Sequence, residues 1–386
     1  MSRNTAVQTT GAPANHPRTT CLLRPRDPRQ GTPPAPPADR AAGHHDIQAV
    51  GRAGRISRRA VLRGGLALLA GGTATPGVLR AAWAAAPLKQ ATVRFNWTIK
   101  GEFTPFFVAR EQGYYEQAGV KVDLLEGKSG AQAVEVVGAG RDTFGYVPSV
   151  QVIEAITGGI PLKTVAAMGR YTGMCWASWP NVPLTKPKDL EGRRVSISPA
   201  STFFQVWPGF VRKFGIDASK VDIVHADPSA RVGLFLSHRL DIMADIFWAN
   251  DYVILQVKAG SPLNTLKLSS LNFDPLGYLL AANAQVLARD PDLVKRVTSA
   301  TLKGVRYTID HPDEAISIMT RLYGSRLSPE IIAGQVRNLV PMIVRPALGK
   351  ATEDEWARSL TILYTSGVIH KRLALHDYYT NEFVGG

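Results

Sequence analysis

The chain has 386 residues, of which 45 are Lys or Arg and 31 are Asp or Glu, so its formal net charge is +14. Hydrophobic residues make up 45% of it, which excludes a wholly disordered chain, and its two cysteines are too few for a disulfide framework or a thiolate zinc site. Residues 1–84 contain 12 arginines and only three acidic residues, so most of the excess charge lies there. Residues 85–386 contain 33 basic and 28 acidic residues, a balance that argues against a nucleic-acid-binding surface.

The N-terminal segment divides into two parts. Residues 1–50 are rich in Pro, Ala, Arg and Thr and lack apolar periodicity, so we expect a disordered extension. Within residues 51–84, Ser57-Arg58-Arg59-Ala60-Val61-Leu62 and the Gly-rich apolar stretch after it resemble a twin-arginine export signal. Ala82-Trp83-Ala84 fits the small-x-small rule and predicts cleavage after Ala84. The alternative, a membrane anchor, conflicts with an apolar stretch far shorter than the ~20 residues that span a bilayer.

From residue 90 onward, short apolar strands alternate with amphipathic helices. The predicted strands are 92–97, 120–125, 143–147, 162–168, 194–198, 221–225 and 241–247. The predicted helices are 106–113, 131–138, 149–157, one that begins at Ser201 or Thr202, 230–240, 294–309, 312–322, 329–336 and 353–366. This alternation predicts an α/β protein with two domains, parallel sheets covered by helices on both faces, and a helical tail that packs back on the first domain.

Several motifs occur in a fixed order along the mature chain. Val108-Ala109 precedes Gly113-Tyr114-Tyr115 and Gly119, and the stretches 126–130, 138–145, 158–163 and 186–195 follow. Together they resemble the solute-binding proteins of ABC importers for nitrate, sulfonate, taurine and thiamine-pyrimidine precursors, over roughly residues 90–320. The resemblance implies a periplasmic-binding-protein type II fold with two α/β lobes and two hinge crossings. Lobe I would comprise residues 90–175 plus 277–386 and lobe II residues 176–276, with crossings near 171–179 and 273–278.

The resemblance also implies a function. We expect a monomeric periplasmic protein that captures a small organic solute between two closing lobes: a sulfonate, a pyrimidine-like compound or another planar or apolar acid. The expected partners are the permease and ATPase of an ABC transporter, and the twin-arginine translocon during export. No cofactor and no nucleic acid are expected.

The candidate ligand-binding residues lie in the loops after the strands, because ligands of open α/β sheets bind beyond the carboxyl ends of strands, near helix N-termini. Aromatic candidates could stack on a planar solute, and polar candidates could donate or accept hydrogen bonds. The plainer alternatives are core packing for the aromatic residues and helix capping for the hydroxyls. The candidates are Trp97, Glu102, Phe103, Ser129, Tyr146, Ser201, Thr202, Phe203, Trp248 and Asn250.

One loop departs from the family pattern. Relatives that bind a thiamine pyrimidine often carry Asn and His where this chain has Lys100, Glu102 and Phe103. The departure argues against a simple transfer of the pyrimidine ligand to this chain.

The sequence contains no catalytic constellation. Its mature histidines lack metal-ligand spacing, Gly-x-Ser-x-Gly does not occur, and Cys175 beside Trp176 is typical of a buried apolar residue. We therefore expect a binding protein without catalytic residues or a metal. Two alternatives remain: a binding-protein-like enzyme of pyrimidine or cofactor metabolism, and a receptor module that reports ligand occupancy to a membrane sensor.

Overall fold

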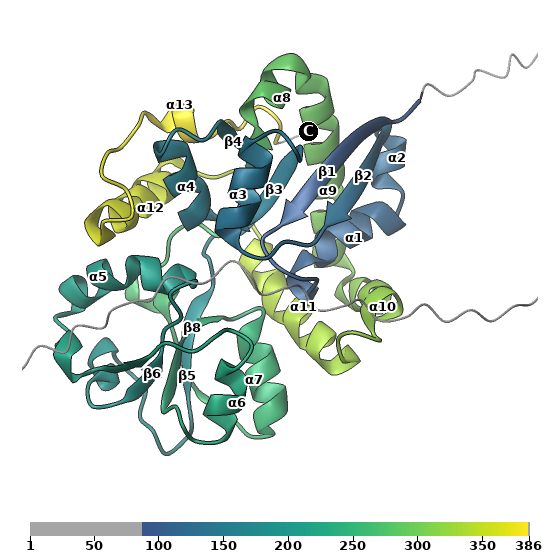
Figure 1. Cartoon of the computed structure of the whole chain (residues 1–386). Helices are drawn as coiled ribbons and strands as arrows, with labels where there is room; N and C mark the ends of the chain where they lie inside the picture. The colour runs from purple at the N-terminus through teal and green to yellow at the C-terminus, as the bar shows by residue number, and fades with distance from the viewer. Residues whose placement is uncertain (1–86, 385–386) are drawn as a thin grey trace, which may run out of the picture. The chain divides into compact units, whose positions relative to one another are not determined.

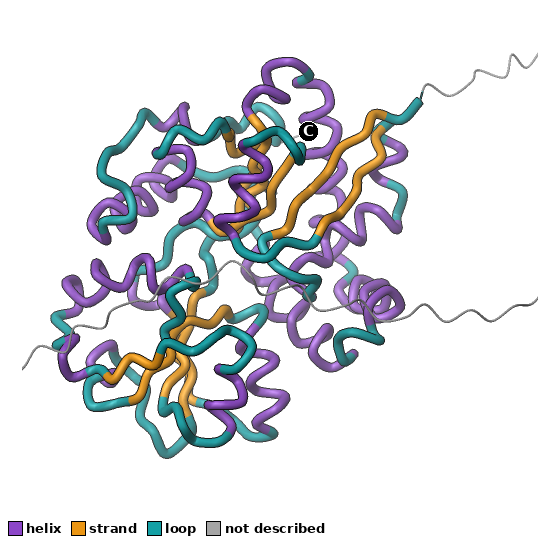
Figure 2. Tube along the Cα trace, in the orientation of Figure 1, coloured by secondary structure: helices purple, strands orange, loops and turns teal. Residues whose placement is uncertain are grey.

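The computed structural model describes residues 87–384. The predicted extension, export signal and cleavage site lie outside this range. Within it, no helix is both long and apolar enough to cross a membrane. The described chain forms two five-stranded sheets flanked by helices, which we call lobe I and lobe II (Figure 1, Figure 2).

The sheet of lobe I has the strand order β2-β1-β3-β10-β4. Its strands are β1 (Lys89–Phe95), β2 (Val120–Leu125), β3 (Phe144–Pro148), β4 (Leu162–Ala167) and β10 (Tyr278–Asn283). The sheet of lobe II has the order β7-β6-β8-β5-β9. Its strands are β5 (Met174–Ser178), β6 (Arg194–Ser196), β7 (Asp222–Val224), β8 (Ile242–Phe247) and β9 (Asn264–Lys267).

Both sheets are mixed but rich in parallel strands, as the sequence predicted, since one strand in each runs against the other four. In lobe I, β10 lies between β3 and β4 and is antiparallel to both. In lobe II, β5 lies between β8 and β9 and is antiparallel to both. Each of these strands follows a crossing from the other lobe and therefore enters its sheet from the opposite end. The strands predicted from the sequence did not include β5, β9 or β10.

Every predicted helix is present, most with shifted ends, whereas α2, α7, α8 and α13, whose bounds follow, were not predicted. In lobe I and the tail they are α1 (Thr104–Glu111), α2 (Tyr114–Gln117), α3 (Gly130–Gly138), α4 (Ser149–Thr157), α8 (Ala284–Arg289), α9 (Pro291–Asp310), α10 (Pro312–Tyr323), α11 (Pro329–Ile343), α12 (Glu353–Ser366) and α13 (Leu375–Tyr378). In lobe II they are α5 (Thr202–Phe214), α6 (Arg231–Leu236) and α7 (Asp251–Ala259). Short 3-10 turns complete the chain: η1 (Gly101–Phe103), η2 (Pro187–Leu190), η3 (Ala218–Lys220) and η4 (Leu268–Leu271).

Alternation along the strands places apolar side chains on both faces of each sheet. On β10, Leu279 and Ala281 belong to the core under α3 and α4, whereas Leu280 belongs to the core under α1 and α9. On β5, Trp176 packs with α5, and Cys175 packs with α6 and α7. A period of two with both faces apolar is what a sheet buried between two helix layers requires.

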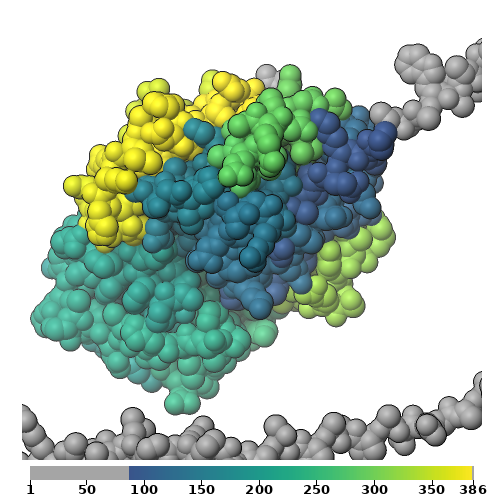
Figure 3. Space-filling view, turned by 45° about the horizontal axis from the view of Figure 1, so that its top comes forward, coloured from purple at the N-terminus to yellow at the C-terminus, as the bar shows by residue number. Residues whose placement is uncertain are grey.

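The C-terminal tail contacts both lobes. Gly209 of α5 lies so close to α12 that an added Cβ would be 2.1 Å from Ser366 Oγ. Figure 3 shows the yellow C-terminal surface directly against the teal surface of lobe II. The helix α12 begins with a capping box at Thr352 and Glu355, which the sequence Thr-x-x-Glu encodes, and ends at Gly367 with φ +79°.

Candidate solute-binding cleft

A cavity of about 310 Å³, which we call the cleft, lies at the carboxyl ends of the strands. Both lobes contribute residues to it, from the loops that follow β1, β2 and β3 in lobe I and β6, β7 and β8 in lobe II. This is the position that open α/β sheets offer to a ligand. Its lobe I residues are Asn96, Trp97, Lys100, Ser129, Gly130, Pro148 and Gln151, and its lobe II residues are Ala200, Ser201, Thr202, Pro228, Ser229, Arg231, Val232, Asp245, Phe247, Asn250, Asp251 and Ile254.

Trp97 follows directly on β1. The strand ends with Phe95 fully buried, and Trp97 beyond it is 38% exposed at the cleft. The loop after β2 approaches this strand end because Gly127 has no side chain: an added Cβ would lie 2.0 Å from the carbonyl oxygen of Phe95. With Phe247 on the opposite lobe, Trp97 gives the cleft an aromatic surface on each side, which suits a planar solute.

Lys100 is a buried cation at the lobe I wall. Its Nζ lies 3.0 Å from Glu102 Oε1, and both side chains are more than 90% buried. Burial raises the pKa of Glu102, and the neighbouring ammonium opposes that rise. The Nζ also lies 5.1 Å from the ring centre of Phe103 and 5.8 Å from that of Tyr278. Lys100 is therefore held in place and its charge is compensated within the protein.

Arg231 is the corresponding cation of lobe II. Its guanidinium contacts Asp245 at 3.0 Å and Asp251 at 2.8 Å. Burial lowers the pKa of Arg231, but the two carboxylates outweigh it and the net pKa is raised. Asp245 also accepts a hydrogen bond from the Ser198 amide at 2.8 Å, and burial raises its pKa. The lobe II wall is thus a rigid network with one cation and two carboxylates.

Three buried polar atoms that line the cleft have no hydrogen-bond partner among the described residues. Two are acceptors, Asn96 Oδ1 and Gln151 Oε1, and one is a donor, Arg231 Nε. The Gln151 amide is oriented by bonds from its Nε2 to Gln205 Oε1 at 2.6 Å and Thr202 Oγ1 at 3.3 Å. Buried polar groups are normally satisfied, so these atoms mark where a bound solute would bond.

Five of the ten predicted residues line the cleft: Trp97, Ser129, Ser201, Thr202 and Asn250. Ser129 accepts from the Gln132 amide at 3.1 Å and Ser201 from the Phe204 amide at 3.1 Å, so both hydroxyls cap their helices.

The other five lie outside the cleft wall. Phe103 is fully buried and stacks on Phe95 with centroids 4.2 Å apart, so it does not form an aromatic pair with Trp97 across a solute. Tyr146 packs in the same aromatic cluster, and Phe203 packs against Trp176. Trp248 stacks on Tyr252 at 4.5 Å, and Glu102 lies beneath Lys100.

Gln335 of α11 is a cleft-supporting residue that the sequence analysis did not identify. It is fully buried, its Oε1 accepts from the Gly101 amide at 2.6 Å, and its Nε2 donates to Asn250 Oδ1 at 3.0 Å. One amide from the tail therefore joins the Lys100 loop of lobe I to the start of α7 in lobe II. Residues 329–343 also contain Glu330, Arg337 and Asn338, so no local signal in the sequence distinguishes Gln335.

The described residues include no group of His, Cys, Asp and Glu side chains that could hold a metal ion. Cys175 is fully buried, and burial raises its pKa well above the ordinary value. A thiol in that environment is a poor nucleophile.

Comparison with known proteins identifies the family. The NMT1/THI5-like family model matches residues 100–315, more than half of the chain. The chain belongs to this family. Its relatives include a riboflavin-binding protein of Chloroflexus aurantiacus, which is 23% identical over 81% of this chain and 93% of its own length. A 4-amino-5-hydroxymethyl-2-methylpyrimidine phosphate synthase of Legionella pneumophila is 19% identical over 76% of this chain and 92% of its own.

Solved structures show the same fold. The periplasmic aliphatic sulphonate-binding protein of Escherichia coli superposes with a TM-score of 0.62 at 16% identity, over 75% of this chain and 91% of that one. The predicted periplasmic-binding fold with two α/β lobes is therefore confirmed. Gln335 lies outside the segment that the family model matches.

Proposed function

We propose that this chain is the solute-binding component of an ABC importer and that its solute is an uncharged, planar nitrogen heterocycle rich in N–H donors. Lobe I, residues 90–175 and 277–386, and lobe II, residues 176–276, would close on this solute. Trp97 and Phe247 would cover its two faces, and Asn96, Gln151 and Asn250 would bond its edge. Hinge closure of this kind is the mechanism that the fold supports.

The pairing of charges in the cleft is the observation that favours an uncharged solute. Lys100 is paired with Glu102, which lies beneath it, and Arg231 is paired with Asp245 and Asp251, so each cation of the cleft wall already has a carboxylate partner. An entering anion would lose its hydration, and among the described residues no cation that lines the cleft lacks a carboxylate partner, so none is available to replace the lost water. A neutral ring loses far less solvation free energy on entry. The sequence alone had left sulfonates and other acids open.

The unpartnered atoms indicate the edge of the solute. Asn96 Oδ1 and Gln151 Oε1 both require donors, and Arg231 Nε requires an acceptor. Ring N–H or amino groups of a solute supply the donors, and a ring nitrogen or carbonyl oxygen supplies the acceptor. The riboflavin named for the relative from Chloroflexus aurantiacus is a nitrogen heterocycle with a ring N–H and carbonyl oxygens, in agreement with this pattern.

Matched pairs of compounds test the proposal. Thermal unfolding of the mature protein would be followed with uracil and orotate, nicotinamide and nicotinate, riboflavin and its 5′-phosphate, and with nitrate and ethanesulfonate. We expect the neutral member of any pair that binds to bind at least about tenfold more tightly. Tighter binding of an anionic member, or stabilisation by nitrate and sulfonates alone, would contradict the proposal.

The same samples test the alternative that the chain is an enzyme, which is considered because one relative is a synthase. Mass spectrometry of the panel compounds after incubation with the protein would reveal turnover. Recovery of every bound compound unchanged supports a binding protein. Conversion of a compound that the cleft variant Trp97→Ala no longer converts would place the chain among the enzymes.

The proposal extends to export and partners. The protein would pass the twin-arginine translocon, lose its leader after Ala84 and dock as a monomer on its permease. Replacing Arg58 and Arg59 by Lys should retain the precursor in the cytoplasm, and N-terminal sequencing of the periplasmic form should begin at Ala85. Export of the Lys variant at the normal level would argue for a different route.

A further inference from the structure

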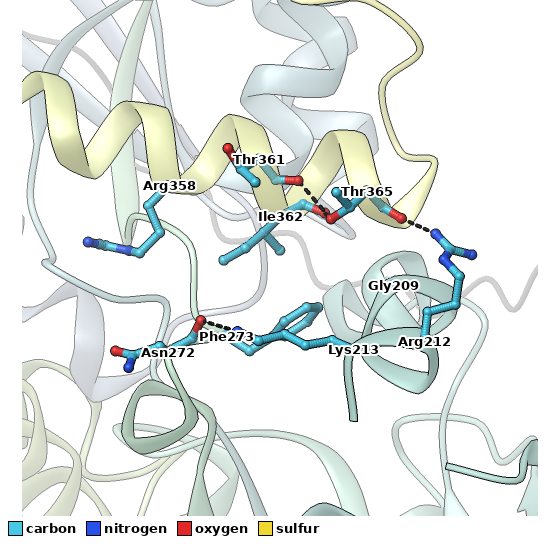
Figure 4. Close-up of a pocket in the computed structure, with 9 residues that line it drawn as sticks. All are labelled: Gly209, Arg212, Lys213, Asn272, Phe273, Arg358, Thr361, Ile362 and Thr365. Atoms are coloured by element: carbon cyan, nitrogen blue, oxygen red, sulfur yellow. Dashed lines mark hydrogen bonds between the residues drawn. The ribbon is translucent and has the colours of Figure 1, made fainter. Parts of the chain in front are cut away.

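A second cavity lies between α5 of lobe II, α12 of the tail and the segment that returns to lobe I. It has a volume of about 550 Å³, and we call it the α5–α12 cavity. Figure 4 shows Arg358, Thr361, Ile362 and Thr365 of α12 on one side, and Gly209, Arg212 and Lys213 of α5 with Asn272 and Phe273 on the other. It shares no residue with the cleft.

Three cations line this cavity, and no acidic residue does. Among the described residues, none of Arg212, Lys213 and Arg358 lies within ion-pair distance of a carboxylate, in contrast to the cations of the cleft. Lys213 donates to the Asn272 carbonyl at 2.8 Å, and Arg212 donates to the Thr365 carbonyl. These bonds hold the side chains at the rim of the cavity without neutralising them.

Two of the cations are partly removed from water. Burial lowers the pKa of Lys213, whose Nζ lies 5.4 Å from the ring centre of Phe273. Arg358 Nε is buried and has no hydrogen-bond partner among the described residues, while its guanidinium lies 5.4 Å from the ring centre of Tyr171. Arg358 interacts electrostatically with the buried carboxyl group of Asp274, which lies beyond ion-pair distance. A cation without an ion pair that has lost part of its hydration still gains from a bound anion.

The inner wall is apolar. Phe273 is 2% exposed and Ile362 is 5% exposed, and the two side chains face each other across the cavity in Figure 4. Arg358 and the Asn272 amide lie together at one end of the cavity. A small inorganic ion would leave most of the volume empty, whereas an organic group of one or two rings would fill it and contact the small surface that Phe273 and Ile362 expose.

From this arrangement we propose that the α5–α12 cavity is a second binding site, which takes an organic anion with an apolar body. The anionic group would lie between Arg358, Lys213 and the Asn272 amide, and the apolar body would lie against Phe273 and Ile362. The occupant would touch α5, α12 and the returning crossing at once, so it would bridge both lobes at a site separate from the transported solute.

Calorimetric titration of the mature protein with 2-naphthalenesulfonate, and with the neutral 2-naphthalenemethanol and inorganic sulfate, tests the proposal. We expect the sulfonate to bind at least about tenfold more tightly than either comparison compound. Lys213→Gln and Arg358→Gln should each weaken it several-fold, and the double variant about tenfold or more. Lys188→Gln and Arg289→Gln, which change exposed cations elsewhere, should leave it unchanged.

A cleft variant separates this proposal from the proposed function. Trp97→Ala should leave sulfonate binding intact, because Trp97 does not line the α5–α12 cavity. The inference would be overturned if the sulfonate did not bind measurably, or bound no more tightly than the alcohol or sulfate. It would also be overturned if Lys213→Gln left sulfonate binding unchanged, or if Trp97→Ala abolished it. Lys213 is exposed, so Lys213→Gln keeps the test valid if the Arg358 variant unfolds.

Discussion

The cleft and the α5–α12 cavity lie between the same two lobes, and both contain cationic side chains. The cations of the cleft are paired with carboxylates, whereas among the described residues those of the α5–α12 cavity are not. In the cleft, Lys100 and Arg231 are buried and paired with acidic partners 2.8 to 3.0 Å away. In the α5–α12 cavity, Arg212, Lys213 and Arg358 bond to backbone carbonyls or stack on aromatic rings. A cation in a pocket therefore indicates an anionic ligand only where the protein has not already neutralised it.

The largest expected effect comes from breaking the network in the cleft. Arg231→Met keeps the side-chain volume but leaves Asp245 and Asp251 without their cation. Removing one partner of a buried ion pair costs about 3–5 kcal/mol, so the free energy of unfolding in urea should fall by that amount. A loss below about 1 kcal/mol at neutral pH would show that the carboxylates are not held by Arg231.

The carboxyl group of Asp274 lies on the crossing that returns from lobe II, between the two regions. It is 1% exposed and accepts from the Thr172 and Gly173 amides at 3.0 and 3.2 Å, and burial raises its pKa to about 7. The folded protein thus retains a proton that the unfolded chain releases near pH 4, so stability should fall as pH rises from 4 to 7. The loss amounts to up to about 4 kcal/mol.

Asp274→Asn isolates this contribution. The difference in unfolding free energy between wild type and variant, measured in urea at pH 4.5, 6 and 8, should shift in favour of the variant as pH rises. A pH-independent difference would mean that Asp274 titrates at an ordinary pKa in the folded protein.

Gln335 offers a smaller and more local test of the cleft. Gln335→Leu leaves the Gly101 amide and Asn250 Oδ1 without partners, which should cost about 2 kcal/mol of stability. It should also weaken binding of whichever panel compound occupies the cleft, because Asn250 loses its fixed orientation. Gln117→Leu, at an exposed position, is the matched control. Equal effects of the two substitutions on stability and on binding would show that Gln335 does not support the cleft.

The smallest expected effect concerns the α5–α12 cavity. Lys213→Gln removes a cation that has no acidic partner, so the unfolding free energy should change by no more than about 0.5 kcal/mol. Urea denaturation at low and moderate salt measures it. A loss comparable to that of Arg231→Met would show that Lys213 has a structural role like that of the cleft cations.

Local signals in the sequence predicted much of this architecture. Ser129, Ser201 and Thr352 cap the helices that were expected to begin there, and the loops after the strands do surround the cleft. Such features depend on neighbouring residues, so the sequence carries them directly.

Features that join distant segments could not be predicted in the same way. Arg231 meets Asp245 and Asp251 only because α6, β8 and α7 converge, and Gln335 reaches Asn250 from the tail. The strands β5 and β10 enter their sheets in the antiparallel direction because the chain returns from the other lobe. Phe103 and Tyr146 have the same local sequence character as cleft aromatics, but they are buried by residues far away in the chain.

The position of a bound anion tests the central claim most directly. Crystals of the mature protein soaked in 6-bromo-2-naphthalenesulfonate would locate the bromine by its anomalous scattering. Charge compensation predicts a peak beside Phe273 and Ile362 in the α5–α12 cavity and none in the cleft. A bromine between Trp97 and Phe247, with the sulfonate at Lys100 or Arg231, would contradict it.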